Sequence, residues 1–452
     1  MVALAVLLAA AVLVSGTVPL HKSQLEAWFH QKVKPCTERK GIIDHALLIA
    51  ELNKRVIKVM KDGSGDCKTI SDAIKMIPAG NTKRVIVHIG PGVYDEQVRI
   101  EKTKPFVTLF GLPSSMPNLT YSGGATVVVE SEYFMASNII FSNTPLESSG
   151  NKIDWKSNDL KSKGEDASSQ AQKNSSPKSS GNKIDWKRND LKSKGEDASW
   201  HAQKNSSSKP SEKKSKGAHA QTQAQTETQK QTQTQTQAQT QTQTQIQKQT
   251  QTQTQTETQA QAQTQTQALK ISGDKAAFYS CKFMGIRDTL HDEQGRHLFK
   301  DCTIQGALDF IYGSAKSLYL NSKVHVLADN GLTSIVAPDR SSKSKDTGFV
   351  FVHCDVTGTN SETYLGRAGS THPQAIYAYS NIGVINPAGW FNKLHPHQGA
   401  GTNTEFLEYM NQGPGAKTSK SDKFSKSLSA SEAQSFISLS YIQASTWLLP
   451  AP

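Results

Sequence analysis

Short apolar runs separated by turn residues make up two stretches of the chain. Between residues 55 and 145, and again from residue 265, brief runs rich in Val, Ile, Phe and Tyr alternate with Gly, Pro and Asn. No long helical period separates these runs, and such spacing is typical of short strands joined by turns. The pattern predicts an all-β, repetitive fold in both stretches.

An internal repeat with an offset of 21 residues appears after residue 276. AFYSCKFMGIRDTL, from Ala277, aligns with LFKDCTIQGALDFI, from Leu298, and a Phe-x-x-Cys-x-apolar-x-Gly pattern returns at Phe351. The aligned pairs are Phe278 and Phe299, Cys281 and Cys302, Phe283 and Ile304, Gly285 and Gly306, and Asp288 and Asp309. Helical solenoids need longer repeats, whereas short strands fit one coil per repeat. We therefore expect a right-handed parallel β-helix, with Phe and Cys stacked in its core and Gly at its turns.

Two aspartates fall at equivalent positions of this repeat, Asp288 and Asp309. Equivalent positions on neighbouring coils lie one strand spacing apart, about 4.7–4.9 Å. Two carboxylates at that distance repel each other unless a neighbour compensates, so a purely structural role is unnatural for them. The repeat therefore makes Asp288 and Asp309 a candidate catalytic pair.

Between the two β-rich stretches the chain changes in character. SSGNKIDWKSNDLKSKGEDAS, from Ser148, recurs from Ser179 with one substitution, and an alternating Gln-Thr tract follows from about residue 220. Such sequence has too little apolar surface to offset the entropy lost on ordering. We expect residues 146–264 to be a disordered insert that divides the β-helix into 55–145 and 265–452.

The first residues resemble a secretory signal. An apolar run from Val2 to Val14 is followed by Ser15 and Gly16, and it is too short to span a membrane. We expect residues 1–16 to be a signal peptide, residues 17–54 a leader, and the mature chain to be a secreted monomer without a membrane segment.

The formal charge of +12 suggests a polyanionic partner at first sight. However, residues 148–217 hold 16 Lys and Arg against 9 Asp and Glu, a surplus of 7 of those 12 charges. The excess thus belongs mainly to the expected insert, and we expect no nucleic-acid partner. Five cysteines are too few for a disulfide scaffold in 452 residues, and no Cys or His spacing indicates a metal site.

Several segments resemble, in order, the signature segments of plant pectinesterases, most closely the pollen-type members. They are GPGVYDEQV from Gly90, KISGDKAAFYSCKFMGIRDTL from Lys270, GALDFIYGSA from Gly306, YLGRA from Tyr364 and GPGA from Gly413. The resemblance covers about 55–145 and 265–450. It implies a carboxylic ester hydrolase of the cell wall that removes methyl esters from pectin (homogalacturonan) and releases methanol, without a metal or cofactor. It also leaves a proteinaceous inhibitor open as a partner.

The same resemblance implies roles for individual residues. Asp309 is the expected nucleophile and Asp288 the expected general acid and base, while Arg367 is expected to orient Asp309 or bind substrate. Gln265 falls, by spacing, on a substrate-binding Gln of the family.

Two positions depart from the family pattern. Arg287 occupies the place of a Gln that serves as an oxyanion donor, and Gly369 the place of a Trp that would stack on a sugar ring. Loss of one oxyanion donor typically costs on the order of 10²–10³ in rate. Two alternatives therefore stay open: an impaired relative that keeps the fold and at most binds pectin, and a wall-associated structural protein whose Gln-Thr tract is the functional part.

Overall fold

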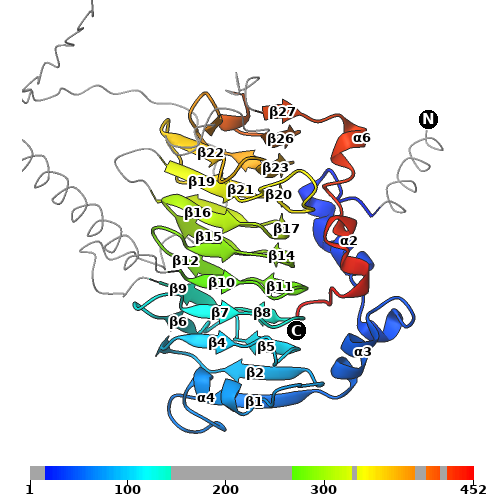
Figure 1. The fold of residues 1–452 in the computed structure, drawn as a ribbon, viewed down its shortest axis with the longest axis vertical. Coiled ribbons are helices and arrows are strands. Elements are labelled where there is room, and N and C mark those ends of the chain that lie inside the picture. The colour runs from blue at the N-terminus through cyan, green and yellow to red at the C-terminus, as the bar shows by residue number, and fades with distance from the viewer. Residues whose placement is uncertain (1–15, 144–266, 328–332, 392–403, 418–424) are drawn as a thin grey trace, which may run out of the picture. The chain divides into compact units, whose positions relative to one another are not determined.

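Three parallel sheets wind into one β-helix in the computed structural model, which describes residues 16–143, 267–327, 333–391, 404–417 and 425–452 (Figure 1). Every pairing between strands of these sheets is parallel, and from β2 to β26 consecutive strands belong to different sheets. The predicted right-handed parallel β-helix is confirmed. The expected signal peptide, most of the expected insert, and Gln265 lie outside the described residues.

The strands and helices have the following bounds. The first sheet contains β1 (Arg55–Val59), β2 (Val85–Ile89), β5 (Val107–Phe110), β8 (Met135–Ser137), β11 (Ala276–Tyr279), β14 (Arg296–Lys300), β17 (Lys316–Leu320), β20 (Gly348–Val352), β23 (Gln374–Ala378), β26 (Glu405–Tyr409) and β27 (Ser425–Ser427). The second sheet contains β3 (Val93–Asp95), β6 (Asn118–Thr120), β9 (Ile140–Ser142), β12 (Lys282–Met284), β15 (Thr303–Gly306), β18 (Lys323–Val326), β21 (Asp355–Thr357) and β24 (Asn381–Ile382). The third sheet contains β4 (Val98–Ile100), β7 (Val127–Val129), β10 (Leu269–Ile271), β13 (Leu290–Asp292), β16 (Leu308–Gly313), β19 (Thr333–Pro338), β22 (Thr363–Arg367) and β25 (Trp390–Phe391). The α-helices are α2 (Leu25–Lys32), α3 (His45–Leu52), α4 (Ile70–Lys75) and α6 (Ala430–Ala433), and the short 3-10 helices are η1 (Lys22–Gln24), η2 (Cys36–Glu38), η3 (Gly415–Lys417), η4 (Leu439–Ile442) and η5 (Ala444–Thr446).

A ladder of aromatic rings runs through the interior of the helix along the first sheet. Its rings are Phe278, Phe299, Tyr319, Phe351 and Tyr377, all of them fully buried. Successive centroids lie 4.7, 4.7, 4.4 and 4.6 Å apart, and the planes are within 11° of parallel. The expected stacking of the repeated Phe positions is confirmed, and it fills the core with the largest side chains at one position per coil.

The Cys positions of the repeat are also buried, as expected. Cys281, Cys302 and Cys354 each follow a strand of the first sheet and point inward, and all five cysteines are free thiols. Burial raises the pKa of the Cys302 thiol well above its ordinary value and that of Cys354 to about 12. These thiols therefore fill the interior as apolar groups at the corners of three coils.

The outer face of the first sheet is covered by both ends of the chain. Trp28 and Phe29 of α2 and Trp447 near the C-terminus share one hydrophobic cluster with Leu298 and Leu318 of the sheet. In Figure 1, α2 and the C-terminal segment lie side by side along this face. The segment after β27 therefore covers the coils and does not continue them, which differs from the expected extension of the β-helix to residue 452.

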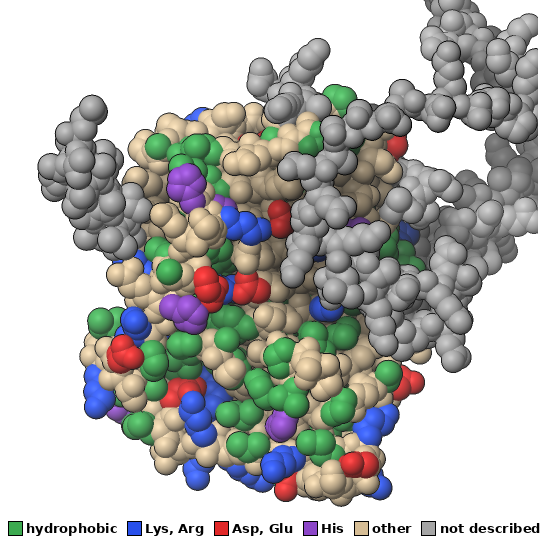
Figure 2. All heavy atoms as spheres, turned by 180° about the vertical axis from the view of Figure 1, so that it is seen from behind, with side chains coloured by type: hydrophobic (Ala, Val, Ile, Leu, Met, Phe, Trp, Pro, Cys, Tyr) green, Lys and Arg blue, Asp and Glu red, His purple; other side chains and the backbone are tan. Residues whose placement is uncertain are grey.

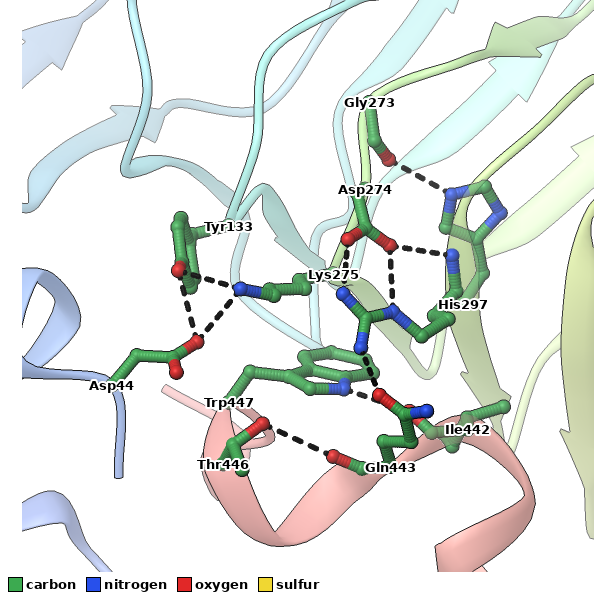
Figure 3. Close-up of polar contacts among 11 residues, drawn as sticks. Asp44, Tyr133, Gly273, Asp274, Lys275, His297, Ile442, Gln443, Thr446 and Trp447 are labelled. Atoms are coloured by element: carbon green, nitrogen blue, oxygen red, sulfur yellow. Dashed lines mark hydrogen bonds and ion pairs between the residues drawn. The ribbon is translucent and has the colours of Figure 1, made fainter. Parts of the chain in front are cut away.

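Polar contacts fasten these segments to the coils (Figure 3). Asp44 of the leader accepts hydrogen bonds from the Tyr133 hydroxyl at 2.9 Å and from Lys275 Nζ at 2.8 Å. Its backbone N–H donates to the Thr446 carbonyl oxygen at 2.7 Å. Arg296 joins the C-terminal segment to the sheet because it contacts both Asp274 and Gln443.

Charged side chains of both signs are mixed on the face that lies behind the view of Figure 1. Figure 2 shows Lys and Arg interspersed with Asp, Glu and hydrophobic side chains there, and no continuous basic area forms among the described side chains in that view. In the described part of the chain, no helix is long and apolar enough to cross a membrane.

The expected insert leaves and re-enters the helix at one place. Thr126 Oγ1 donates to the Ser142 carbonyl oxygen at 2.8 Å, and the Thr126 N–H donates to the Gln267 carbonyl oxygen at 2.8 Å. The two described ends of the chain at this gap therefore flank a single residue. The register of β10 against β7 and β13 is complete on both sides.

We expect Phe299→Ala to lower the free energy of unfolding by about 3–5 kcal/mol, because it leaves a cavity between two stacked rings. Chemical denaturation of the purified chain measures this. Val384→Ala, at a side chain that is 51% exposed, is the control and should change stability by less than about 0.5 kcal/mol. A loss at Phe299 no larger than in the control would contradict the ladder.

We also expect replacement of residues 144–266 by a short Gly-Ser linker to preserve the fold, because both ends meet at Thr126. Thermal unfolding followed by far-UV circular dichroism should stay cooperative, with the midpoint within a few degrees of the full chain. The same deletion carrying Phe299→Ala is the control that shows the assay detects coil damage. Insoluble or non-cooperative deletion protein would show that the segment is required for folding.

Candidate active site

Asp288 and Asp309 lie next to each other where the chain turns from the second sheet into the third. Arg287 forms a parallel bridge with Leu308, and Leu290 pairs with Ile311, so the offset of 21 residues holds on both sides of the aspartates. Asp288 and Asp309 therefore occupy equivalent positions on neighbouring coils, whose backbones lie about 4.7–4.9 Å apart in the strand-to-strand direction. The structure brings together the pair that the repeat predicted.

The backbone at both aspartates is left-handed, with φ of 52° at Asp288 and 47° at Asp309. Asp tolerates this region better than most residues do. The glycines of the repeat lie at the corners between strands, as expected, since Gly285 follows β12 and Gly306 ends β15. A Cβ on Gly306 would lie 2.3 Å from the Phe310 Cβ, and one on Gly285 would lie 2.5 Å from Thr289 Oγ1. The glycines thus make room for the inward side chains that follow each aspartate, and the aspartates themselves take the turn conformation.

A β-bulge directs the Asp309 side chain. Leu308 pairs with Ser334 and Ile311 with Val336, so three steps along β16 face two along β19. A bulge bends its strand and redirects a side chain, and bulges are common beside active sites. Asp309 is 9% exposed, which places a carboxylate in a largely desolvated position.

Arg367 reaches Asp309 from β22, two strands away in the third sheet. Its Nε donates to Asp309 Oδ2 at 2.7 Å, and its Nη2 lies 2.6 Å from the same oxygen. The other oxygen, Asp309 Oδ1, is buried and has no hydrogen-bond partner in the described structure. The guanidinium thus compensates the buried charge and leaves one carboxylate oxygen available.

Asp288 is in a different electrostatic state. Burial raises the pKa of its carboxyl above the ordinary value, the Asp309 carboxylate adds to this rise, and Arg287 and Arg367 oppose it. The two aspartates are therefore distinguished by their surroundings: Asp309 faces a cation directly, and Asp288 retains its proton to higher pH than an ordinary carboxyl.

The two departures from the family pattern have clear structural settings. Arg287 is exposed beside Asp288, and its charge acts against protonation of that carboxyl. A Cβ at Gly369 would lie 2.7 Å from the Pro338 carbonyl oxygen, so the backbone here has no space for a larger side chain. With this backbone conformation, a Trp side chain could not be accommodated at position 369.

Sequence reasoning missed three residues beside the aspartates. The Tyr312 ring, on β16, stacks on His291 of β13 with centroids 4.3 Å apart and an angle of 11°. Gln267 Nε2 donates to the Tyr312 hydroxyl oxygen at 2.5 Å. Gln267 lies at the end of the Gln-Thr tract, so its composition gave no signal of a structural role. His291 and Tyr312 are separated by the same 21 residues as the aspartates, and this spacing is the signal that could have identified them.

No metal site is found among the described residues, since no group of three His, Cys, Asp or Glu side chains there could hold an ion. The charged and polar groups described beside the Asp pair include the guanidinium groups of Arg287 and Arg367 and the phenol of Tyr312. A carboxylate with a free oxygen, beside a second carboxyl whose pKa is raised, is an arrangement suited to nucleophilic attack with general-acid assistance.

Comparison with known proteins identifies relatives over most of the chain. The family model described as Pectinesterase matches residues 56–157 and 214–445. Probable pectinesterase 49 of Arabidopsis thaliana is 34% identical, over 96% of this chain and 92% of its own length. Pectinesterase 2 of Olea europaea is 33% identical, over 96% of this chain and 91% of its own length.

Solved structures share the fold. The pectin methylesterase from carrot has a TM-score of 0.57 at 23% identity, and the match covers 88% of this chain and 97% of that one. A pectin methylesterase in complex with a hexasaccharide has a TM-score of 0.51 at 17% identity, with 88% and 99% covered. By its sequence and its coils, this chain belongs to the pectinesterase family of carboxylic ester hydrolases.

Proposed function

We propose that the chain removes methyl esters from galacturonate units of cell-wall homogalacturonan and releases methanol outside the cell. Family membership supports pectin as the substrate, and one fold neighbour is a pectin methylesterase in complex with a hexasaccharide. The observation that carries the proposal is the asymmetry of the Asp pair. Asp309 has one oxygen on Arg367 and one without a partner, and Asp288 has a raised pKa.

Asp309 is the nucleophile in this mechanism. Its Oδ1 attacks the C6 carbonyl carbon of the ester, and the resulting tetrahedral intermediate collapses with cleavage of the bond between C6 and the methoxy oxygen. Asp288 gives its proton to that oxygen, so that neutral methanol leaves. C6 is then joined to Asp309 in an acyl-enzyme.

Asp288 acts as the base in the second half of the reaction. Now ionised, it takes a proton from a water whose oxygen attacks C6, and the bond between C6 and Asp309 breaks. The product carboxylic acid loses its proton to solvent, Asp309 returns as a carboxylate and Asp288 is protonated again. Arg367 holds Asp309 Oδ2 throughout, which fixes the direction of Oδ1.

An impaired relative is the second candidate, and Arg287 is the observation that favours it. Its charge opposes protonation of Asp288, and protonated Asp288 is the form that the first step needs. A chain that releases no methanol as wild type, but releases it as Arg287→Gln, would establish this candidate over the first.

We expect Asp309→Asn to lower kcat for methanol release from methylated pectin by about 10⁴-fold or more, because it removes the nucleophile. Asp288→Asn should also abolish most turnover, since an amide cannot transfer the proton. The control is Asp72→Asn, at an exposed carboxylate on α4. Methanol release that survives Asp309→Asn would sink the mechanism.

The pH profile of kcat/KM tests the role of Asp288. Its acid form is lost as the pH rises through its raised pKa, so activity should fall on the alkaline side. Arg287→Gln removes a cation that lowers this pKa, and we therefore expect the alkaline limb to move to higher pH. Arg99→Gln, at an exposed arginine on β4, is the control and should leave the limb in place.

Salt provides an independent measurement of the same effect. Because Arg287 is exposed, added salt screens its charge, and the gap between the wild-type and Arg287→Gln profiles should shrink at high ionic strength. An alkaline limb that is identical in both proteins at low salt would contradict the assignment of Asp288 as the acid.

A further inference from the structure

The proposed reaction requires a hydrogen-bond donor in addition to the roles given to Asp288, Asp309 and Arg367. When Asp309 attacks, negative charge develops on the C6 carbonyl oxygen, and a donor placed in advance stabilises it. Arg367 directs both Nε and Nη2 to Asp309 Oδ2, so these two groups are engaged with the nucleophile. Arg287 is exposed, and water competes for its donors.

The Tyr312 hydroxyl is a donor in a suitable place. Tyr312 lies on β16, three residues beyond Asp309 on the same strand, and is half-buried. Burial raises its pKa, and the charge of Asp288 raises it further, so the phenol keeps its proton and lies within electrostatic reach of the Asp288 carboxyl. Stacking on His291 fixes the plane of the ring.

The hydrogen bond from Gln267 sets the direction of the Tyr312 hydroxyl proton. Its Nε2 donates to the Tyr312 oxygen at 2.5 Å, so this oxygen acts as the acceptor of the pair. A phenol has one O–H donor, and that donor is therefore left for another partner. Apart from the Gln267 amide, the described structure gives the hydroxyl no hydrogen-bond partner.

We propose that the Tyr312 hydroxyl, held by the Gln267 amide, donates a hydrogen bond to the carbonyl oxygen of the ester as that oxygen becomes negatively charged. Tyr312 is then a catalytic residue and Gln267 a positioning residue. This inference rests on the proposed esterase function. A phenol and an amide that served only to fill space would be replaceable there by apolar side chains of the same shape at little cost.

Tyr312→Phe is the direct test, because it removes one oxygen and preserves the ring stack on His291. A donor used only in the transition state lowers kcat and leaves KM unchanged, and we expect a loss of about 10²-fold in methanol release. Tyr409→Phe, at a half-buried tyrosine on β26 in the first sheet, is the matched control and should retain wild-type kinetics.

Gln267→Glu tests the direction of the proton. A carboxylate can only accept, so it takes the phenol proton away from the substrate, and kcat should fall as in Tyr312→Phe. The double variant Tyr312→Phe with Gln267→Glu should lose no more than either single variant, because both remove the same hydrogen bond. Thermal midpoints are recorded for every variant, so that loss of folding is distinguished from loss of catalysis.

The outcomes separate this inference from the function on which it rests. Wild-type kcat in Tyr312→Phe, a rise in KM with kcat unchanged, or additive losses in the double variant would each overturn the role of Tyr312. If Asp309→Asn is inactive in the same assay, the proposed function stands in all three cases. Methanol release that survives Asp309→Asn would instead overturn the proposed function.

Discussion

The parallel register between successive coils is the constraint on which the rest of the structure depends. Backbone hydrogen bonds hold equivalent residues about 4.7–4.9 Å apart along the stack, inside and outside the helix alike. Inside, this spacing matches the distance between stacked aromatic rings, and Phe278 and Phe299 occupy it with centroids 4.7 Å apart. Outside, the same spacing forces Asp288 and Asp309 together. One geometric rule thus produces both a close-packed core and an unfavourable pair of carboxylates.

The surroundings turn this unfavourable pair into two different groups. Leaving two adjacent carboxylates ionised in a partly buried position is costly, and the cost falls if one is neutralised by a cation and the other retains its proton. Arg367 hydrogen-bonds one carboxylate oxygen of Asp309, and the rise in the pKa of Asp288 completes the division. Arg287 weakens it, since its charge favours the ionised form of Asp288. In the proposed mechanism, the balance between these two arginines sets how readily Asp288 can act as the acid.

Sequence analysis succeeded where the coil length stays constant. The constant offset of 21 residues places Phe278 on Phe299 and Asp288 on Asp309, and both pairs are neighbours in the structure. The next coil could not be recognised as a copy of the repeat, because Tyr319 follows Phe299 after only 20 residues and Ser322 replaces the repeated Cys. The cover over the first sheet could not be predicted either, because segments that meet through Asp44 and Thr446 have no periodicity to align. Periodic contacts can be predicted from a single sequence, and contacts between unlike segments cannot.

Gln267 lies just before a strand of the coils, in a sequence context unlike that of the coils. It is the first described residue after the gap in the chain, and its composition is that of the Gln-Thr tract before it. Its place is nevertheless fixed, because β10 begins two residues later and is paired on both sides, with β7 and with β13. The coils on either side therefore determine where the chain re-enters, whatever the length of the segment before it. The polar tract can thus end on a side chain that is held in contact with Tyr312, 45 residues away along the chain and on the same strand as Asp309.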